Sequence, residues 1–108
     1  MNKQHVVVTF MNGPEDGLRM SVDGASVSIG QDPGNDVVIN FDPRVASKHL
    51  ELLHSDGQWL LVDRSEGAGV FLDGVRIHEH TPLLPDKLVY IGDTLLKINV
   101  TGVIDVAC

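Results

Sequence analysis

Short apolar runs, each closed by a turn residue, restrict the fold of this sequence more than any other feature. Apolar side chains recur at alternate positions or in brief runs, and Gly, Pro, Asn or Asp bounds each run. None of the runs reaches the about ten residues that an amphipathic helix needs. The sequence therefore predicts an all-β chain of about ten or eleven short strands. The runs are residues 5–10, 18–22, 27–29, 37–39, 49–54, 59–62, 70–72, 75–77, 88–91 and 95–100.

Two Asp-Gly pairs, Asp56-Gly57 and Asp73-Gly74, each stand between two apolar runs. This pair supplies the positive φ angles of a tight hairpin turn, so a hairpin is expected at each. About ten strands in a chain of this size do not fit one open sheet, and two sheets packed face to face are the natural solution. We therefore expect an antiparallel β-sandwich.

Composition limits the classes of partner and the cellular compartment that we expect for this chain. Fifteen acidic against eight basic residues give a formal charge of −7, which repels nucleic acid and anionic lipid, so no nucleic-acid partner is expected. No apolar stretch approaches the about 18 residues of a membrane helix, and no direct membrane insertion is expected. The only cysteine, Cys108, allows no internal disulfide, which suits a cytoplasmic location.

The chain is expected to form one domain over residues 1–108, with its core at about residues 4–100, because no linker or low-complexity tract divides it. Residues 101–108, TGVIDVAC, are either a final strand or the start of a linker. The sequence leaves these two alternatives open.

An ordered set of turn and polar residues runs through the middle of the chain: Ile29-Gly30-Gln31, Asn35-Asp36, Asp42-Pro43-Arg44-Val45-Ala46-Ser47-Lys48-His49, Trp59-Leu60-Leu61-Val62-Asp63, Ala68-Gly69-Val70, Asp73-Gly74 and Ile91-Gly92. In order and spacing it resembles the forkhead-associated (FHA) domain family. That resemblance implies a β-sandwich whose loops at one end read phosphothreonine peptides, with no cofactor.

The resemblance also shows what this chain lacks. The family has an Arg at the position of Gln31, a Ser at Ala46, an Asn at Ala68 and a Thr at Val70, and commonly Arg or Lys at Ser47. Each hydrogen bond to a charged group contributes about 1.5–3 kcal/mol, so losing two removes about 3–6 of the about 8 kcal/mol of a micromolar complex. We therefore expect recognition that does not depend on phosphothreonine.

The remaining residues of the pattern divide into binding and structural groups. Gly30 and Gly69 are expected to meet backbone requirements, His49 to brace the loops, and Trp59 to pack in the core. The expected partner-binding loop residues are Gln31, Arg44, Ala46, Ser47, Lys48, Ala68, Gly69 and Val70. The expected structural residues are Gly30, Asn35, His49, Asp73 and Gly74.

Two sets of residues could suggest a chemical site, and neither is favoured. His78-Glu79-His80 offers two imidazoles, half a metal site at most, and an exposed polar loop is the simpler interpretation. Ser47, His49 and Asp42 do not have the arrangement of a hydrolytic triad. No metal, cofactor or enzymatic activity is expected.

The resulting hypothesis is a protein-interaction module, a scaffold or adaptor that binds a protein or peptide within a bacterial assembly such as a secretion system. The alternative is a signalling domain that still binds phosphothreonine, through Arg44, Ser47 and Lys48. The acidic residues expected near the loops, Asp32, Asp36, Asp42 and Glu66, are either solvated surface or a patch for a basic partner.

Overall fold

The computed structural model describes residues 3–77, 80–83 and 87–103. These residues form strands and loops, without a helix. The strands are β1 (Lys3–Phe10), β2 (Arg19–Asp23), β3 (Ser26–Gly30), β4 (Val37–Val38), β5 (Leu50–Ser55), β6 (Gln58–Asp63), β7 (Val70–Leu72), β8 (Val75–Arg76), β9 (His80–Pro82), β10 (Leu88–Ile91) and β11 (Thr94–Val103).

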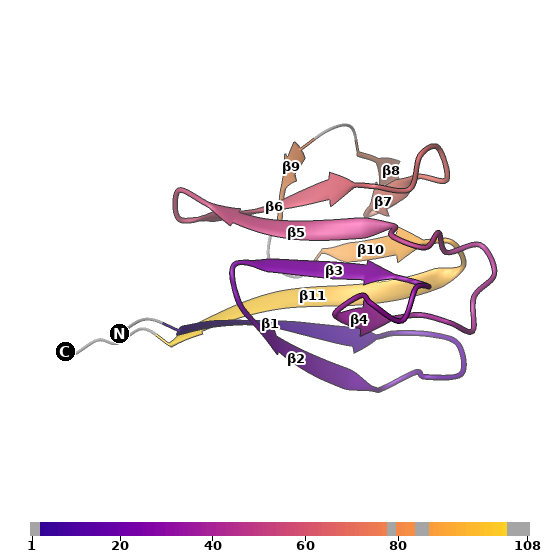
Figure 1. Cartoon of the computed structure of the whole chain (residues 1–108), viewed down its shortest axis with the longest axis horizontal. Coiled ribbons are helices and arrows are strands. Elements are labelled where there is room, and N and C mark those ends of the chain that lie inside the picture. Colours follow the sequence, from indigo (N-terminus) through magenta and orange to yellow (C-terminus); the bar gives the residue numbers. More distant parts are fainter. Residues whose placement is uncertain (1–2, 78–79, 84–86, 104–108) are drawn as a thin grey trace.

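The strands form two sheets that pack as a sandwich (Figure 1). One sheet has six strands in the order β2-β1-β11-β10-β7-β8, and the other has five in the order β4-β3-β5-β6-β9. The expected all-β sandwich is confirmed. One pairing departs from the expected antiparallel pattern: β4 lies parallel to β3, with Ile29 beside Val37 and Gly30 beside Val38. A hairpin turn would make the two strands antiparallel. The loop of residues 31–36 instead brings the chain back so that β4 runs beside β3 in the same direction.

The ten expected strands are all present, and β9 is an additional one. Its sequence, His-Thr-Pro, has no apolar alternation, and its strand character comes from pairing with β6, where Leu60 faces Pro82 and Val62 faces His80. His80 therefore lies in a strand and not in the expected polar loop. His78 and Glu79 are outside the described residues. The last strand, β11, continues through residues 101–103. This part of the tail is therefore a final strand, which was one of the two alternatives.

The Asp-Gly pairs at residues 56–57 and 73–74 both form hairpin turns. Asp56 and Gly57 have φ angles of 53° and 77°, and Asp73 and Gly74 have φ angles of 51° and 85°. Positive φ at both central residues belongs to the type I′ turn, which matches the twist of the flanking strands. The two expected hairpins, β5–β6 and β7–β8, are confirmed.

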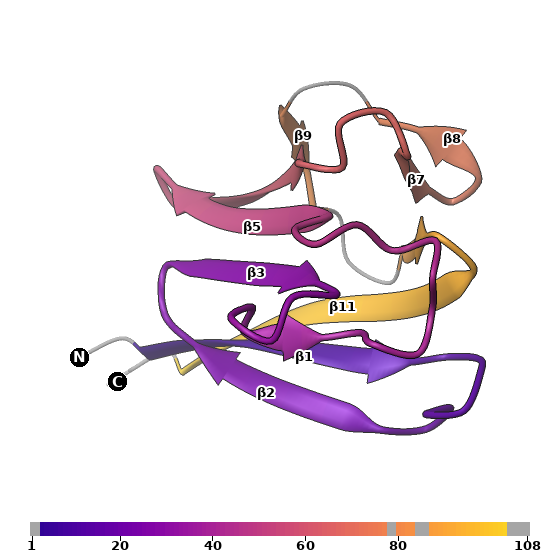
Figure 2. The same cartoon turned by 45° about the vertical axis from the view of Figure 1, so that its right-hand side comes forward.

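The core lies between the sheets and follows the alternation of each strand. Val6, Val8 and Phe10 of β1 and Leu96 and Ile98 of β11 are buried, while the residues between them are more exposed. Trp59 has 6% of its surface exposed, which confirms its expected place in the core. In the turned view of Figure 2 the five-stranded sheet covers the six-stranded one, and the loops between strands gather at the ends.

The described residues contain no cluster of His, Cys, Asp and Glu suited to a metal ion. Within the same residues there is also no helix of the length and apolar character needed to span a membrane.

Candidate functional site

Three loops meet at one end of the sandwich, to the right in Figure 1. They connect β3 to β4 (residues 31–36), β4 to β5 (residues 39–49) and β6 to β7 (residues 64–69). The first two are joined by backbone hydrogen bonds from Gln31 N to Ala46 O (2.9 Å) and from Asp32 N to Ser47 O (3.1 Å). The β3–β4 and β4–β5 loops thus form one connected surface.

His49 links two of the loops from below. The ring is fully buried, its Nδ1 accepts the N–H of Ala46 at 3.0 Å, and its Nε2 lies 2.7 Å from the carbonyl oxygen of Gly69. Because a backbone N–H only donates, Nδ1 carries no proton, and Nε2 must donate to Gly69. Both ring nitrogens are therefore used by the backbone. This geometry leaves neither of them to act as a base for Ser47.

Ser65 holds the β6–β7 loop in place. Its hydroxyl donates to Asp63 Oδ1 at 2.6 Å and accepts the N–H of Gly69 at 2.7 Å. Asp63 also accepts the N–H of Ser65, at 2.8 Å. A continuous series of hydrogen bonds therefore runs from Asp63 through Ser65, Gly69 and His49 to Ala46, and it fixes the distance between the β4–β5 and β6–β7 loops.

Gly30 lets the β3 and β4–β5 backbones approach each other. A Cβ at this position would lie 2.3 Å from the carbonyl oxygen of Ser47 and 2.9 Å from the side-chain nitrogen of Asn35. That nitrogen donates to the same Ser47 oxygen at 2.7 Å and to Asp32 O at 2.8 Å. Close approach, and not positive φ, is the reason for glycine here. Asn35 ties together the two loops that this approach brings into contact.

Asp42 is the buried carboxylate of the site, with 4% of its surface exposed. Burial would raise its pKa, but hydrogen bonds from the Thr94 hydroxyl (2.6 Å) and from the N–H groups of Arg44 and Asp93, together with the Arg44 charge, outweigh burial and lower the pKa. Asp42 thus joins the β4–β5 loop to the β10–β11 turn. It is not part of an acidic surface.

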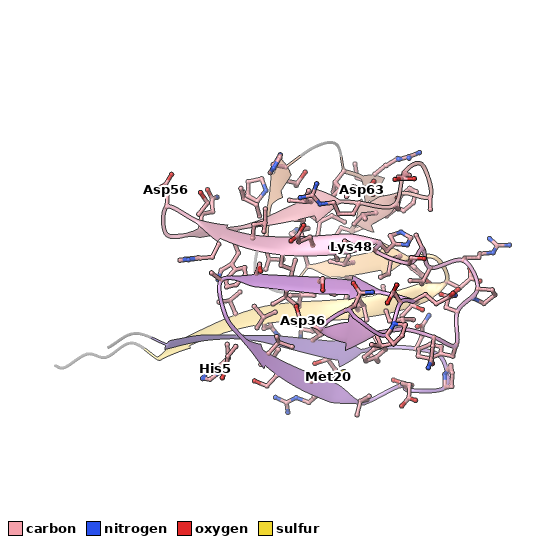
Figure 3. The ribbon with its side chains drawn as sticks, in the orientation of Figure 1. His5, Met20, Asp36, Lys48, Asp56 and Asp63 are labelled. Carbon is pink, nitrogen blue, oxygen red and sulfur yellow. The ribbon has the colours of Figure 1, made fainter. Side chains whose placement is uncertain are left out.

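The surface above this framework carries few charged donors. Gln31 is half-buried and its Nε2 donates weakly to Asp42 O at 3.4 Å, and Ala46 is half-buried beside it. Ser47 and Lys48 are exposed, and they line a shallow groove of about 250 Å³ together with Ser28, Asp32, Gly34 and Asn35. Figure 3 shows Lys48 and Asp36 on this side of the molecule.

The other expected binding residues lie in different environments. Arg44 is exposed, and its Nε lies 3.6 Å from Asp93 Oδ2. Ala68 is exposed on the β6–β7 loop, whereas Gly69 is buried and Val70 is fully buried in the core. The expectation that Val70 faces a partner is not met, because it is the first residue of β7 and its side chain lies on the inner face of the sheet.

Sequence reasoning missed three residues that build the site: Asp63 as a hydrogen-bond acceptor, Ser65 and Thr94. For Ser65 a signal existed, since an Asp followed two residues later by Ser marks a local side-chain turn. Thr94 carried no comparable signal, because its partner Asp42 is 52 positions away in the sequence.

Comparison with known proteins places these features in a family. The family model described as "inner membrane component of T3SS, cytoplasmic domain", where T3SS is the type III secretion system, matches residues 9–102. Among curated proteins, no sequence matches this chain.

Solved structures share the fold at low sequence identity. The cytoplasmic domain of the T3SS sorting platform protein PscD of P. aeruginosa is 23% identical, with a TM-score of 0.74 over 87% of this chain and 78% of that one. The FHA domain of CT664 from Chlamydia trachomatis is 22% identical, with a TM-score of 0.76 over 87% and 95%. Mycobacterium tuberculosis EmbR in complex with a low-affinity phosphopeptide is 18% identical, with a TM-score of 0.77 over 88% of this chain and 24% of EmbR. These likenesses establish an FHA-like fold.

Proposed function

This chain belongs to the family of cytoplasmic domains of type III secretion inner-membrane components, and from that premise we propose that it is a protein-interaction domain that needs no phosphothreonine. It would act as a scaffold or adaptor on the cytoplasmic side of a bacterial secretion assembly. Its partner would be a protein or peptide, and its role would be binding and not catalysis.

The observation that carries the proposal is the contrast between an ordered framework and a loop surface with few cationic donors. A dianionic phosphate that leaves water needs fixed donors to compensate its charge. Three cations lie on the described parts of the three loops, and two of them already face carboxylates: Arg44 faces Asp93, and Arg64 Nε donates to Glu51 Oε1 at 2.9 Å. The third, Lys48, is a flexible point charge in a groove that also contains Asp32.

The family and the similar solved structures support the proposed role in a secretion assembly. The PscD domain is described as part of a sorting platform, and by analogy we propose that this chain contributes to a comparable assembly. We further propose that the residues on the loop surface with exposed or half-exposed side chains, Gln31, Arg44, Ala46, Ser47, Lys48 and Ala68, are the part of the loops a partner would reach.

A phosphopeptide array tests the proposal. The chain is applied to paired peptides that differ only in phosphorylation of threonine, and we expect no systematic preference for the phosphorylated member. Arg44→Ala and Lys48→Ala serve as controls for residual anion binding. A strong preference for phosphorylated peptides that either substitution removes would overturn the proposal and favour phosphothreonine recognition through Arg44, Ser47 and Lys48.

A further inference from the structure

The outer face of the six-stranded sheet carries an apolar row. Leu95 of β11 faces Tyr90 of β10, and Tyr90 faces Phe71 of β7. The residues beside them along the strands, among them Val89 and Leu96, are fully buried, so alternation places the row on the outer face. Tyr90 has 41% of its surface exposed. Large apolar side chains that gather on one open face mark a surface that a partner covers.

Basic residues lie at the end of this row and along its side. Arg76 of β8 faces Phe71 and is exposed. Lys97 is two residues from Leu95 along β11, which sets a second row about 7 Å from the first. In that second row one residue of β1 separates Lys97 from Arg19 of β2. This face therefore presents cations around apolar side chains, although the formal charge of the whole chain is −7.

Two carboxylates border the face, and each is held by a basic side chain. Asp23, at the end of β2, is bonded to Nδ1 of His5. Asp73, in the β7–β8 turn, has its Oδ2 atom 3.1 Å from Lys87 Nζ. The carboxylates of a partner can therefore approach the basic residues of the face without displacing either pair.

The outer face of the five-stranded sheet is also apolar in part, but it carries carboxylates. Leu53 of β5 faces Leu60 of β6, and Glu51 lies two residues from Leu53 along β5. The Asp36 carboxylate is bonded to the residue of β3 that faces Glu51. Arg64 compensates the charge of Glu51 in part, through a bond of 2.9 Å. An acidic partner is therefore attracted by the six-stranded face more than by this one.

The six-stranded face has the dimensions of one short helix. The apolar row continues to Met11, which is 40% exposed and whose N–H bonds to the carbonyl oxygen of Leu95 at 2.9 Å. Between Met11 and Arg76 the row takes four steps from strand to strand, a length of about 19 Å. An α-helix of about 13 residues has this length, and its diameter of about 10 Å covers both rows.

We infer that the six-stranded face binds an amphipathic α-helix of a partner protein, with acidic residues beside its apolar stripe. The stripe packs on Leu95, Tyr90 and Phe71, and the acidic residues meet Arg76, Lys97 and Arg19. Charge-assisted hydrogen bonds at these positions fix the orientation of the helix. The inference goes beyond the proposed function, because the sheet face and the loop surface use different residues.

Selection of peptides from a display library tests the inference. The library holds helical peptides of about 13 residues, randomised along one apolar stripe and at the positions beside it. We expect the enriched peptides to carry acidic residues beside the stripe and to bind more weakly as salt is added. Fluorescence anisotropy should show affinity losses of about tenfold or more for Tyr90→Ala and for Lys97→Glu.

A charge-reversed pair is the sharpest control. When lysine replaces the acidic residues of an enriched peptide, that peptide should bind the double variant Arg19→Glu, Lys97→Glu more tightly than it binds the wild-type chain. Arg44→Glu changes the net charge by the same amount as Lys97→Glu, but at the loop end, and should leave binding unchanged. Urea denaturation of each variant checks that it is folded.

The inference would be overturned if no peptide were enriched, or only basic ones. Enriched peptides that bind Tyr90→Ala and Lys97→Glu as tightly as the wild-type chain would also overturn it. If Arg44→Glu alone weakened their binding, the peptides would belong to the loop surface, and the proposed function would stand without this inference. Binding of the chain to phosphatidylglycerol vesicles that Lys97→Glu removes would overturn it as well and assign the face to an anionic membrane surface.

Discussion

The framework under the three loops at the end of the sandwich and the surface of the same loops differ sharply in how their polar groups are used. Beneath the loops, His49, Ser65 and Asp42 are buried, and each makes at least two hydrogen bonds. On the surface, the side chain of Gln31 makes one long hydrogen bond. Ala46 and Ala68 have no polar side-chain atom. The difference teaches that the residues that hold the loops in place and the residues that the loops present at the surface are separate sets.

This separation has a physical basis. A buried polar group that loses its partner costs about 1–3 kcal/mol, so the framework resists substitution. A surface side chain changed to alanine usually alters stability by no more than about 0.5 kcal/mol, so the ligand chemistry can change while the fold persists. Substitutions in the framework and substitutions on the loop surface should therefore differ in their effect on stability.

The largest effect is expected for Gly30→Ala. The added Cβ would lie 2.3 Å from the Ser47 carbonyl oxygen, and since that contact is with backbone, the β3 strand or the β4–β5 loop must shift. We expect a loss of about 3 kcal/mol in the free energy of unfolding, measured by urea denaturation. Gly34→Ala is the matched control, because its Cβ would lie 3.4 Å from a movable Asp32 carboxylate oxygen. Equal effects of the two changes would contradict the close-approach explanation.

The next largest loss in the free energy of unfolding is expected for His49→Leu. The substitution puts an apolar side chain in place of the buried imidazole and leaves the Ala46 N–H and the Gly69 carbonyl without their partners. We expect a loss of about 2–3 kcal/mol and increased amide hydrogen exchange in both the β4–β5 and β6–β7 loops. Confinement of the exchange to one loop would show that His49 does not join them.

Asp42→Asn should cost about 1–3 kcal/mol at pH 7, because hydrogen bonds to a charged acceptor are lost. The folded-state pKa of Asp42 is lowered from its ordinary value of 3.8, so its charge contributes stability above pH 3.8 that is lost as the pH falls through the folded pKa. The stability difference between the two proteins should therefore shrink below about pH 4. A difference that stays constant from pH 7 to pH 2 would refute the role of the charge.

The smallest effect is expected for Lys48→Ala. The side chain is exposed at the edge of the groove, and the change should alter the unfolding free energy by no more than about 0.5 kcal/mol. A loss of about 2 kcal/mol or more would be as large as the cost of a buried polar group that loses its hydrogen bond. Such a loss would mean that the surface and the framework are not separate. Thermal unfolding of Lys48→Ala beside His49→Leu makes the comparison direct.

Much of the fold could be predicted because the strands alternate and the turns have specific residues. The Asp56-Gly57 and Asp73-Gly74 pairs required positive φ and formed the two expected hairpins. The direction of the β3–β4 pairing could not be predicted, since it depends on how the loop between the strands returns. Strand β9 was missed because it takes its conformation from β6 and has no pattern of its own.

The site was harder to predict than the fold. The motif residues indicated which loops meet, but the series from Asp63 through Ser65 and Gly69 to His49 depends on contacts that only the folded chain brings together. Val70 illustrates the limit of position alone. At the start of a strand, a shift of one residue moves a side chain from the loop surface to the core, and Val70 lies on the core side.

The most direct test of the central claim is a calorimetric titration with one matched pair of peptides, phosphorylated and unphosphorylated at threonine. The wild-type chain and the triple variant Gln31→Arg, Ala46→Ser, Ala68→Asn are compared, because the variant adds donors to the same framework. We expect the wild-type chain to bind both peptides alike and the variant to gain a preference of about tenfold or more for the phosphorylated one. A hundredfold preference in the wild-type chain, removed by Arg44→Ala or Lys48→Ala, would contradict the account.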